Sequence, residues 1–488
     1  MKSRNLPIGG SMKKKINFLI MILLVCYSTI IFVEKAGASE QMMTTKVNSI
    51  IAKSWKNNEY SITVRDIETG NVLYNNNGEK MIRPASTHKL LVSAAALDLL
   101  GPDYRFATKT YIDGSIENGV LYGNIYLQGG GDPTLLPSHL ESFANGLKKM
   151  GISKITGSLI GDDTWFDADR LPKGIVPQEE NQPYASRISA LTISPNDQYD
   201  IANVQVKVTG SKVGTTANVQ LVPFASSIPV VNITKIVKKG EKSTVKITRE
   251  YGTDRIIVTG NLPAGSQKST YVTVFNPTLY TLDVFREKLV AKGIQTMPLE
   301  TGKVPENAQQ VGISYSKPLT DINFKYLKLS INGMGDMLTK QLGRELLGEG
   351  SWSAGIQAIR TYGSDNELTM DQWYFEDGSG LSHQNRVNSM QESLLLYKVR
   401  SKSWYNSYLD ALPHAGRKGS LVGATLENRM KGYSVSAKTG YISGTYSLSG
   451  YVKGKSGKWY IFSILTQANK TSAIPTIDEI VKQIANEM

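Results

Sequence analysis

The N-terminal part of the chain contains several distinct hydrophobic patterns. Apolar residues recur at helical spacing over residues 42–55, which predicts an amphipathic helix. Residues 60–78 alternate polar and apolar side chains around residues 69–71, which predicts a β-hairpin. Residues 86–101 are rich in Ala and Leu and end at a glycine, as expected of a buried helix.

The middle of the chain has a different pattern, in which short strand-like segments are separated by glycine turns. Residues 140–152 and 282–294 share one pattern: a leucine, a phenylalanine three positions on, a leucine four further on, then Gly-Ile. Each predicts an amphipathic helix with a glycine stop. We interpret them as two halves of one domain, 108–199 plus 271–317; chance similarity of two ordinary helices is the alternative.

An inserted segment lies between these halves. Residues 200–270 alternate polar and apolar side chains and are enriched in β-branched residues, which predicts a small all-β domain. Helical patterns return after residue 318, and residues 433–467 are strand-like. We therefore predict an α/β (α+β) fold in which residues 39–107 plus 318–488 form an antiparallel sheet flanked by helices.

The last helical pattern has one apolar stripe, formed by Ile477, Ile480, Val481 and Ile484. A helix with such a stripe either packs on a core or lies on a membrane surface. Because this one is short and acidic at its start, we expect it to pack on the core.

The N-terminus resembles an export signal. Lysines at 13–15 precede an apolar run over residues 16–33, and Ala36 and Ala38 occupy the small-residue positions before a cleavage site. We expect residues 1–38 to be a signal peptide cleaved after Ala38, with an uncleaved membrane anchor as the alternative. The protein is therefore expected to be secreted or to act at the cell envelope, outside the cytoplasm.

The composition limits which catalytic sites, metal sites and partners the chain can have. The single cysteine, Cys26, lies in the predicted signal, so the mature chain has no disulfide, cysteine nucleophile or cysteine-based zinc site. Four histidines without metal-ligand spacing argue against a metal enzyme, and no cofactor is expected. The formal charge is +13, with scattered lysines. Loose association with anionic wall polymers or the membrane is therefore an open alternative to a merely soluble surface, whereas nucleic acid is not expected as a partner.

Ser86 is the candidate nucleophile. It lies at the start of the Ala-rich helix, with His88 two positions on and Lys89 three positions on. Residues three apart share a helix face and residues two apart do not, so Lys89 is the predicted base. The first amides of a helix lack intrahelical partners, and the Ser86 N–H can therefore help to hold an oxyanion. Burial and a second nearby cation would lower the pKa of Lys89 enough for this role.

Two further short motifs accompany this serine. Lys438, Thr439 and Gly440 form the one Lys-Thr-Gly sequence, at the start of the terminal strand series. The middle motif has three candidates. We choose residues 330–332, Ser-Ile-Asn, because they lead into a helix. Residues 364–366, Ser-Asp-Asn, are interpreted as an exposed turn, and residues 194–196, Ser-Pro-Asn, fall in the inserted region.

With these motifs the chain resembles the three-domain (class C) penicillin-binding D-alanyl-D-alanine carboxypeptidases, which have extra domains between their first and second motifs. Ser86 and Ser330 are correspondingly far apart. The stretches at 131–136, 161–167 and 377–382 also look like that family. The resemblance implies a penicillin-binding/serine β-lactamase-like catalytic domain with two nested inserted domains.

The resemblance also implies a role for each site residue. Ser86 would attack the terminal D-Ala-D-Ala bond while Lys89 takes its proton, and Ser330 with Lys438 would protonate the departing D-alanine. The N–H groups of Ser86 and Tyr441 would hold the oxyanion. The remaining implied contacts to substrate are those of Asn332, Lys438, Thr439, Gly440, Tyr441 and His383.

The sequence departs from the family pattern at three positions. Ile331 replaces a polar residue in the second motif, which we expect to be tolerated. Tyr441 follows Lys-Thr-Gly where Ser or Thr is commoner, so a second hydroxyl on the substrate carboxylate is in doubt. His383 stands where many relatives have Arg, so its contact with the diamino acid of the stem peptide is expected to be weaker or pH-dependent; a plain loop histidine is the alternative.

The expected function is a penicillin-sensitive serine D,D-carboxypeptidase, with endopeptidase activity as a further expectation. Its partners would be peptidoglycan stem peptides ending in D-Ala-D-Ala, with β-lactams as covalent inhibitors. Two alternatives stay open at this point: a β-lactamase, which needs a deacylation base that the sequence does not reveal, and a non-catalytic protein that binds cell wall or senses β-lactams.

Overall fold

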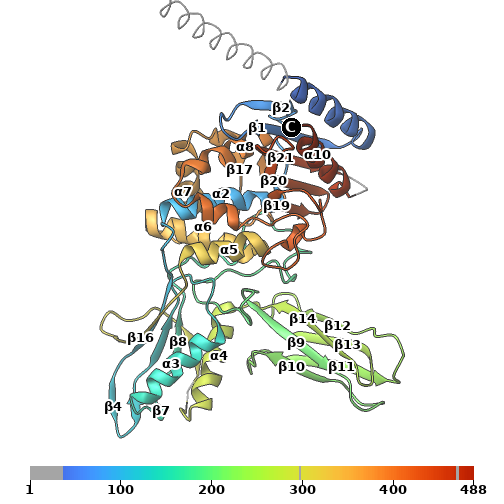
Figure 1. Ribbon diagram of the computed structural model, residues 1–488. Coiled ribbons are helices and arrows are strands. Elements are labelled where there is room, and N and C mark those ends of the chain that lie inside the picture. The colour runs from blue at the N-terminus through green and yellow to red at the C-terminus, as the bar shows by residue number, and fades with distance from the viewer. Residues whose placement is uncertain (1–36, 296–297, 469–471) are drawn as a thin grey trace, which may run out of the picture.

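A computed structural model describes residues 37–295, 298–468 and 472–488 (Figure 1). Most of the predicted signal peptide, residues 1–36, lies outside the described residues. The predicted cleavage position, after Ala38, lies among the described helical residues 37–54. Within the described ranges, none of the helices has the length and apolar character needed to cross a membrane.

The part of the chain that was predicted to be catalytic is built on one five-stranded antiparallel sheet with the order β19-β20-β21-β1-β2. Strands β20 and β21 are buried on both faces, and β21 accordingly reads as an almost continuous apolar run. The strands are β1 (Glu59–Asp66), β2 (Val72–Asn76), β19 (Val435–Ile442), β20 (Thr445–Lys453) and β21 (Trp459–Gln467).

Helices cover both faces of this sheet (Figure 1). One face is covered by the N-terminal helix and by α10 (Ile474–Glu487), whose Ile477, Ile480 and Ile484 are buried in one apolar cluster with Phe462. The expectation that the last helix packs on the core is thus confirmed. The other face is covered by α8 and the helices around it: η1 (Ala85–His88), α2 (Lys89–Leu99), α5 (Leu319–Leu329), α6 (Asn332–Leu347), α7 (Trp352–Asp365), α8 (Ser389–Lys398) and α9 (Tyr405–Asp410).

A second sheet, with the order β15-β8-β6-β3-β16, combines strands from both sides of the inserted segment. Helices α3 (Pro137–Lys149) and α4 (Pro277–Ala291) pack against each other beside it. These helices contain most of the two stretches whose shared pattern indicated one divided unit. The strands are β3 (Ala107–Ile112), β6 (Ile125–Gln128), β8 (Leu159–Asp162), β15 (Leu299–Thr301) and β16 (Gln309–Tyr315), with the small sheet of β4 (Ser115–Glu117), β5 (Val120–Tyr122) and β7 (Lys154–Ile155) beside them.

The segment between β8 and α4 forms two three-stranded sheets, β10-β9-β14 and β11-β13-β12. They reach away from α4 and from the catalytic sheet (Figure 1). Alternating inward Val and Ile residues account for their shared core. The strands are β9 (Asn203–Thr209), β10 (Asn218–Val222), β11 (Val230–Val237), β12 (Lys246–Arg249), β13 (Ile256–Pro263) and β14 (Gln267–Thr273).

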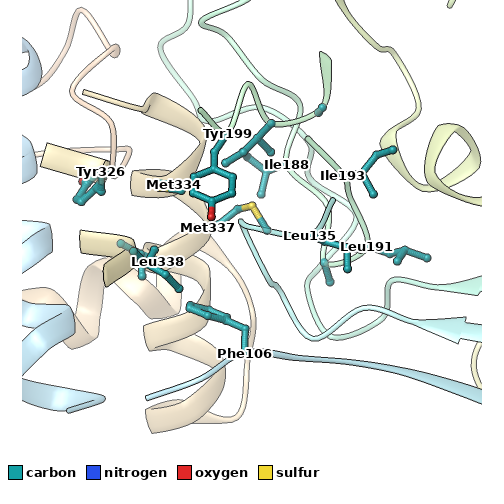
Figure 2. Close-up of a cluster of buried hydrophobic side chains, with 14 of the residues drawn as sticks. Phe106, Leu135, Ile188, Leu191, Ile193, Tyr199, Tyr326, Met334, Met337 and Leu338 are labelled. Carbon is teal, nitrogen blue, oxygen red and sulfur yellow. The ribbon is translucent and has the colours of Figure 1, made fainter. Parts of the chain in front are cut away.

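Apolar side chains join the inserted region to helix α6. Figure 2 shows Met334 and Met337 of α6 close to Tyr199 and Ile188, and all of these side chains are buried. An ion pair between Asp167 and the buried Lys340 adds to this junction. Because α6 begins at Asn332, the inserted region is fixed against the helix that carries part of the candidate site.

Candidate active site

Ser86 lies in a 3-10 turn, η1, that directly precedes α2. The sequence predicted that Ser86 lies on the first turn of the α-helix. In the structure it lies in the short 3-10 turn before that helix. The preceding residue, Ala85, has φ 50°, which is a left-handed conformation that non-glycine residues seldom adopt. Such strained backbone is often found at functional turns.

Lys89 is held directly against this serine. Its Nζ lies 2.8 Å from Ser86 Oγ and donates to Asn332 Oδ1 at 2.7 Å and to the carbonyl oxygen of Ser379 at 2.5 Å. The side chain has 0% exposure. The spacing of three residues therefore brings the predicted nucleophile and the predicted base into contact.

Burial lowers the pKa of Lys89 to about 7, although the nearby carboxylates of Asp377 and Asp336 oppose the shift. Taking an ammonium group out of water disfavours its charged form, which is the physical cause of this change. A lysine with a pKa near neutrality is in its basic form in a large fraction of molecules at neutral pH. Lys89 can therefore accept a proton from Ser86.

His88 points away from this centre. Its Nε2 is 3.1 Å from the backbone oxygen of Asp377, and its ring lies 4.8 Å from that of Phe375. Burial lowers the pKa of His88 to about 4. The histidine is thus a buried packing residue, and the prediction that Lys89 faces Ser86 is confirmed.

The second and third predicted motifs also meet. Lys438 Nζ donates to Ser330 Oγ at 2.8 Å and to the carbonyl oxygen of Thr439 at 2.9 Å. Burial, assisted by the nearby charge of Lys89, lowers the pKa of Lys438 well below its usual value. Ser330 itself has φ 59° and ends α5, so its hydroxyl is presented at a sharp corner between two helices.

Two glycines allow the motifs to approach one another. A Cβ on Gly440 would lie 2.9 Å from Ser86 N and 2.7 Å from the carbonyl oxygen of Pro84. A Cβ on Gly380, which has φ +84°, would lie 2.0 Å from the carbonyl oxygen of Ala85. The backbones of β19 and of the turn at Gly380 therefore reach η1 only because these positions lack side chains.

Two buried carboxyl groups, neither of them predicted as a site residue, lie near Lys89. Asp377 accepts hydrogen bonds from Gly380 N at 3.0 Å and Ser382 N at 2.7 Å, and Asp336 accepts one from Gly378 N at 2.9 Å. Burial, together with the charge of Asp377, raises the pKa of Asp336 to about 7. The motif at 377–382 pointed to this turn, but Asp336 could have been found only as the residue one helical turn after Asn332.

The remaining predicted binding residues line the neighbouring surface. Thr439 Oγ1 lies 2.8 Å from Thr425 Oγ1, and Tyr441 is 64% exposed. His383 lies between two charged groups, with Nδ1 at 3.2 Å from an Arg83 nitrogen and Nε2 at 3.7 Å from a Glu179 oxygen. Glu179 belongs to the inserted region, so that region reaches the edge of the site.

A second contact brings the inserted region to the site. Asn332 Nδ2 donates to the backbone oxygen of Tyr184 at 3.0 Å, across 148 residues of sequence. A cavity of about 370 Å³ borders this contact and is lined by both Ser330 and Asn332. No local pattern in the sequence pointed to Tyr184 or Glu179.

The two rejected middle motifs lie elsewhere. Residues 364–366 end helix α7, where Ser364 and Asp365 are exposed; they form a helix terminus, not the free turn that was expected. Asn196 donates to Asp200 and to the Tyr271 hydroxyl in the inserted region. The choice of residues 330–332 is therefore the one that the geometry favours.

The sequence is similar to known proteins over most of its length. The model of the D-Ala-D-Ala carboxypeptidase 3 (S13) family matches residues 43–488. The chain belongs to the S13 family. This S13 protein is 34% identical over 429 residues to the D-alanyl-D-alanine carboxypeptidase of Actinomadura sp. (strain R39), a match that covers 86% of this chain and 80% of the relative.

Solved structures agree with the fold of this S13 protein. Penicillin binding protein 4 (dacB) from Haemophilus influenzae superposes with a TM-score of 0.76 at 22% identity, covering 89% of this chain and 98% of the other. The same protein complexed with a β-lactam superposes with a TM-score of 0.72 at 22% identity, covering 90% of this chain and 98% of the other. The predicted penicillin-binding fold is confirmed.

Proposed function

We propose that this S13 protein is a penicillin-sensitive serine D-alanyl-D-alanine carboxypeptidase that works through an acyl-enzyme on Ser86. The observation that carries the proposal is the 2.8 Å contact between Ser86 Oγ and the buried Lys89 Nζ. A nucleophilic hydroxyl needs a neighbouring base, and an amine with a lowered pKa is one. Membership of the family and the named activity of the Actinomadura relative support the same reaction.

Acylation follows from the placement of these groups. Ser86 Oγ bonds to the carbonyl carbon of the penultimate D-alanine, and its proton passes to Lys89. The N–H groups of Ser86 and Tyr441 hold the oxyanion. The C–N bond then breaks, and the proton released by Ser86 passes from Lys89 to the departing D-alanine through Ser330 Oγ, which accepts a hydrogen bond from Lys438 Nζ at 2.8 Å.

Binding and deacylation use the neighbouring residues. Asn332, already oriented by Lys89, binds a backbone amide of the stem peptide. Lys438 Nζ and Thr439 Oγ1 donate hydrogen bonds to the terminal carboxylate, beside Gly440. Water then attacks the ester carbon while Lys89 takes its proton. Lys89 returns that proton to Ser86 Oγ as the ester bond breaks, and the shortened peptide is released. A β-lactam would enter the same acylation step and leave slowly.

His383 is proposed to contact the stem peptide. Its position between Arg83 and Glu179 supports a charged contact at the rim of the cleft. The cavity beside Ser330 and Asn332 supports a further activity on cross-linked peptides, because the larger leaving group of an endopeptidase substrate needs space beyond the catalytic serine. Both assignments extend the carboxypeptidase proposal to larger substrates.

The place and architecture of this activity are also proposed. Residues 1–38 would export the chain to the cell envelope, where peptidoglycan lies. Residues 39–107 plus 318–488 would form the catalytic domain, 108–199 plus 271–317 the split domain and 200–270 the small domain. The three groups of sheets described above support this division.

The decisive experiment incubates the protein with a peptide ending in D-Ala-D-Ala and follows free D-alanine. We expect release by the wild type and none by Ser86→Ala. Absence of release by the folded wild type would overturn the proposal. Rapid turnover of penicillin without release of D-alanine would favour a β-lactamase, and stable penicillin binding without either turnover would favour a sensor.

A further inference from the structure

Positive charge is concentrated in one part of the molecule. Residues 200–270 contain ten Lys and Arg residues against four Asp and Glu residues, a net charge of +6. The whole chain has a formal charge of +13, of which residues 1–38 carry +5. The small two-sheet segment therefore carries most of the charge that remains after the predicted signal peptide.

Three loops meet at one end of this segment. The end of β9 pairs with the starts of β10 and β14, since Thr209 is opposite both Asn218 and Gln267. Gly210 N donates to the Ser266 oxygen at 2.9 Å, and Gly214 N donates to the Ile236 oxygen at 2.9 Å. We call residues 210–217, 235–246 and 261–268 together the lysine tip.

The lysine tip contains seven exposed lysines and one acidic residue, Glu241. None of the seven forms an ion pair with the residues that the structure describes. Such a set of like charges repels itself unless an anion neutralises it. The seven are Lys212, Lys235, Lys238, Lys239, Lys242, Lys246 and Lys268.

The opposite end of the same segment is balanced. Arg255 pairs with Glu250 at 3.5 Å, and Asp254 accepts a hydrogen bond from Phe275 N at 2.5 Å. This end also contacts the catalytic part, because Asp200 lines the cavity that reaches Asn332. Most of the unpaired positive charge of this segment thus lies at the end that points away from the active site (Figure 1).

We propose that the lysine tip binds an extended polyanion with repeated phosphodiester groups, of the kind carried by bacterial walls, and so holds the enzyme at its insoluble substrate. The inference rests on the proposed action on peptidoglycan. Flexible ammonium groups suit irregularly spaced phosphates, and binding to such a polymer releases counterions. Because the tip is remote from Ser86, a bound polymer leaves the catalytic cleft open.

A polymer fits this surface better than a lipid bilayer. Binding in a membrane interface requires an apolar face beside the cationic one. Across the lysine tip, all of whose residues are described, Val213 is the only exposed large hydrophobic residue, at 49%. The tip is made of loops and strand ends, and residues 203–273 contain no helix.

The test measures sedimentation of the purified protein with isolated walls that carry phosphodiester-linked polymers. The test variant is Lys238→Glu, Lys239→Glu and Lys242→Glu combined. Its matched control changes three exposed lysines of the catalytic part, Lys53→Glu, Lys56→Glu and Lys453→Glu, and so alters the net charge equally. We expect wall affinity to fall by about tenfold or more for the test variant and to change little for the control.

Two further binding measurements identify the ligand. Walls stripped of phosphodiester polymers with hydrofluoric acid should lose most of the binding, and vesicles of phosphatidylglycerol and phosphatidylcholine should bind weakly. Equal losses in both triple variants, undiminished binding to stripped walls, or binding to vesicles as strong as to walls would overturn the proposal. Circular dichroism confirms folding, and the corresponding Lys→Gln triple gives a milder version of the same change.

A failure of the wall-binding proposal can be told apart from a failure of the proposed enzyme activity. Ser86→Ala should bind walls like the wild type although it releases no D-alanine. The tip variant should release D-alanine from a soluble peptide at the wild-type rate although it binds walls poorly. Loss of soluble-peptide activity in a folded tip variant would contradict the separation of the two surfaces.

Discussion

Lysines at the candidate active site and lysines at the tip differ in their contact with water. Lys89 and Lys438 are fully buried, and each donates to defined oxygen atoms. The lysines of the tip are exposed and have no ion-pair partner in the described chain. Burial disfavours the charged form of a lysine and lowers its pKa, so that the amine can act as a base. Hydration keeps an exposed lysine positively charged, as binding of a polyanion requires.

Removal of the buried base should produce the largest effect. We expect Lys89→Ala to slow acylation by penicillin about 100- to 10,000-fold, because general-base catalysis contributes on that scale. Stopped-flow measurement with a reporter β-lactam gives the rate. His88→Gln is the matched control, since His88 is the neighbouring candidate base; it should retain most of the rate, and a comparable loss there would contradict the assignment.

The pH dependence of acylation should reveal the same group. The pKa of Lys89 is lowered to about 7, so its neutral form grows as pH rises through that value. The acylation rate should therefore increase from pH 6 to pH 8, with a midpoint about 7. A rate that falls over this interval, or a midpoint near the ordinary value for lysine, would contradict a neutral Lys89 as base.

A smaller change should follow from Asp336→Asn. Negative charge on Asp336 opposes the lowering of the Lys89 pKa, so its removal should move the acylation midpoint to lower pH. Asparagine can still accept the hydrogen bonds from Gly378 N and Trp352 Nε1, which limits structural damage. An unchanged midpoint with a uniformly lower rate would show that Asp336 acts only in packing.

The smallest effect on catalysis is expected from the lysine tip. The combined change of Lys238, Lys239 and Lys242 to Glu should leave kcat/KM for a soluble D-Ala-D-Ala peptide within about twofold of wild type, because screening weakens interactions between distant exposed charges. Release of D-alanine under initial-rate conditions provides the measurement. A large decrease would show that the two groups of lysines are coupled.

Much of the catalytic geometry was predictable because it depends on local spacing. Lys89 meets Ser86 because three residues make almost one helical turn, and Lys438 opens the strand series that borders them. The same applies to α3 and α4, whose apolar periodicity and glycine stops are local signals. Helix α10 likewise buries the stripe that its sequence indicated.

Other features depend on contacts between distant parts of the chain. Tyr184 reaches Asn332 across 148 residues, and Glu179 approaches His383 from the same inserted region. Packing of Met334 and Met337 against that region decides these positions, and no local pattern encodes it. The 3-10 turn at Ser86 was also unpredictable, because the close approach of Gly380 and Gly440 shapes it.

The most direct test of the account identifies the residue to which penicillin attaches. The protein is incubated with labelled penicillin and digested, and the labelled peptide is sequenced by mass spectrometry. We predict one adduct, on Ser86, formed slowly or not at all by Lys89→Ala. Attachment to any other residue of the wild-type protein would contradict the central claim that a buried amine activates this hydroxyl.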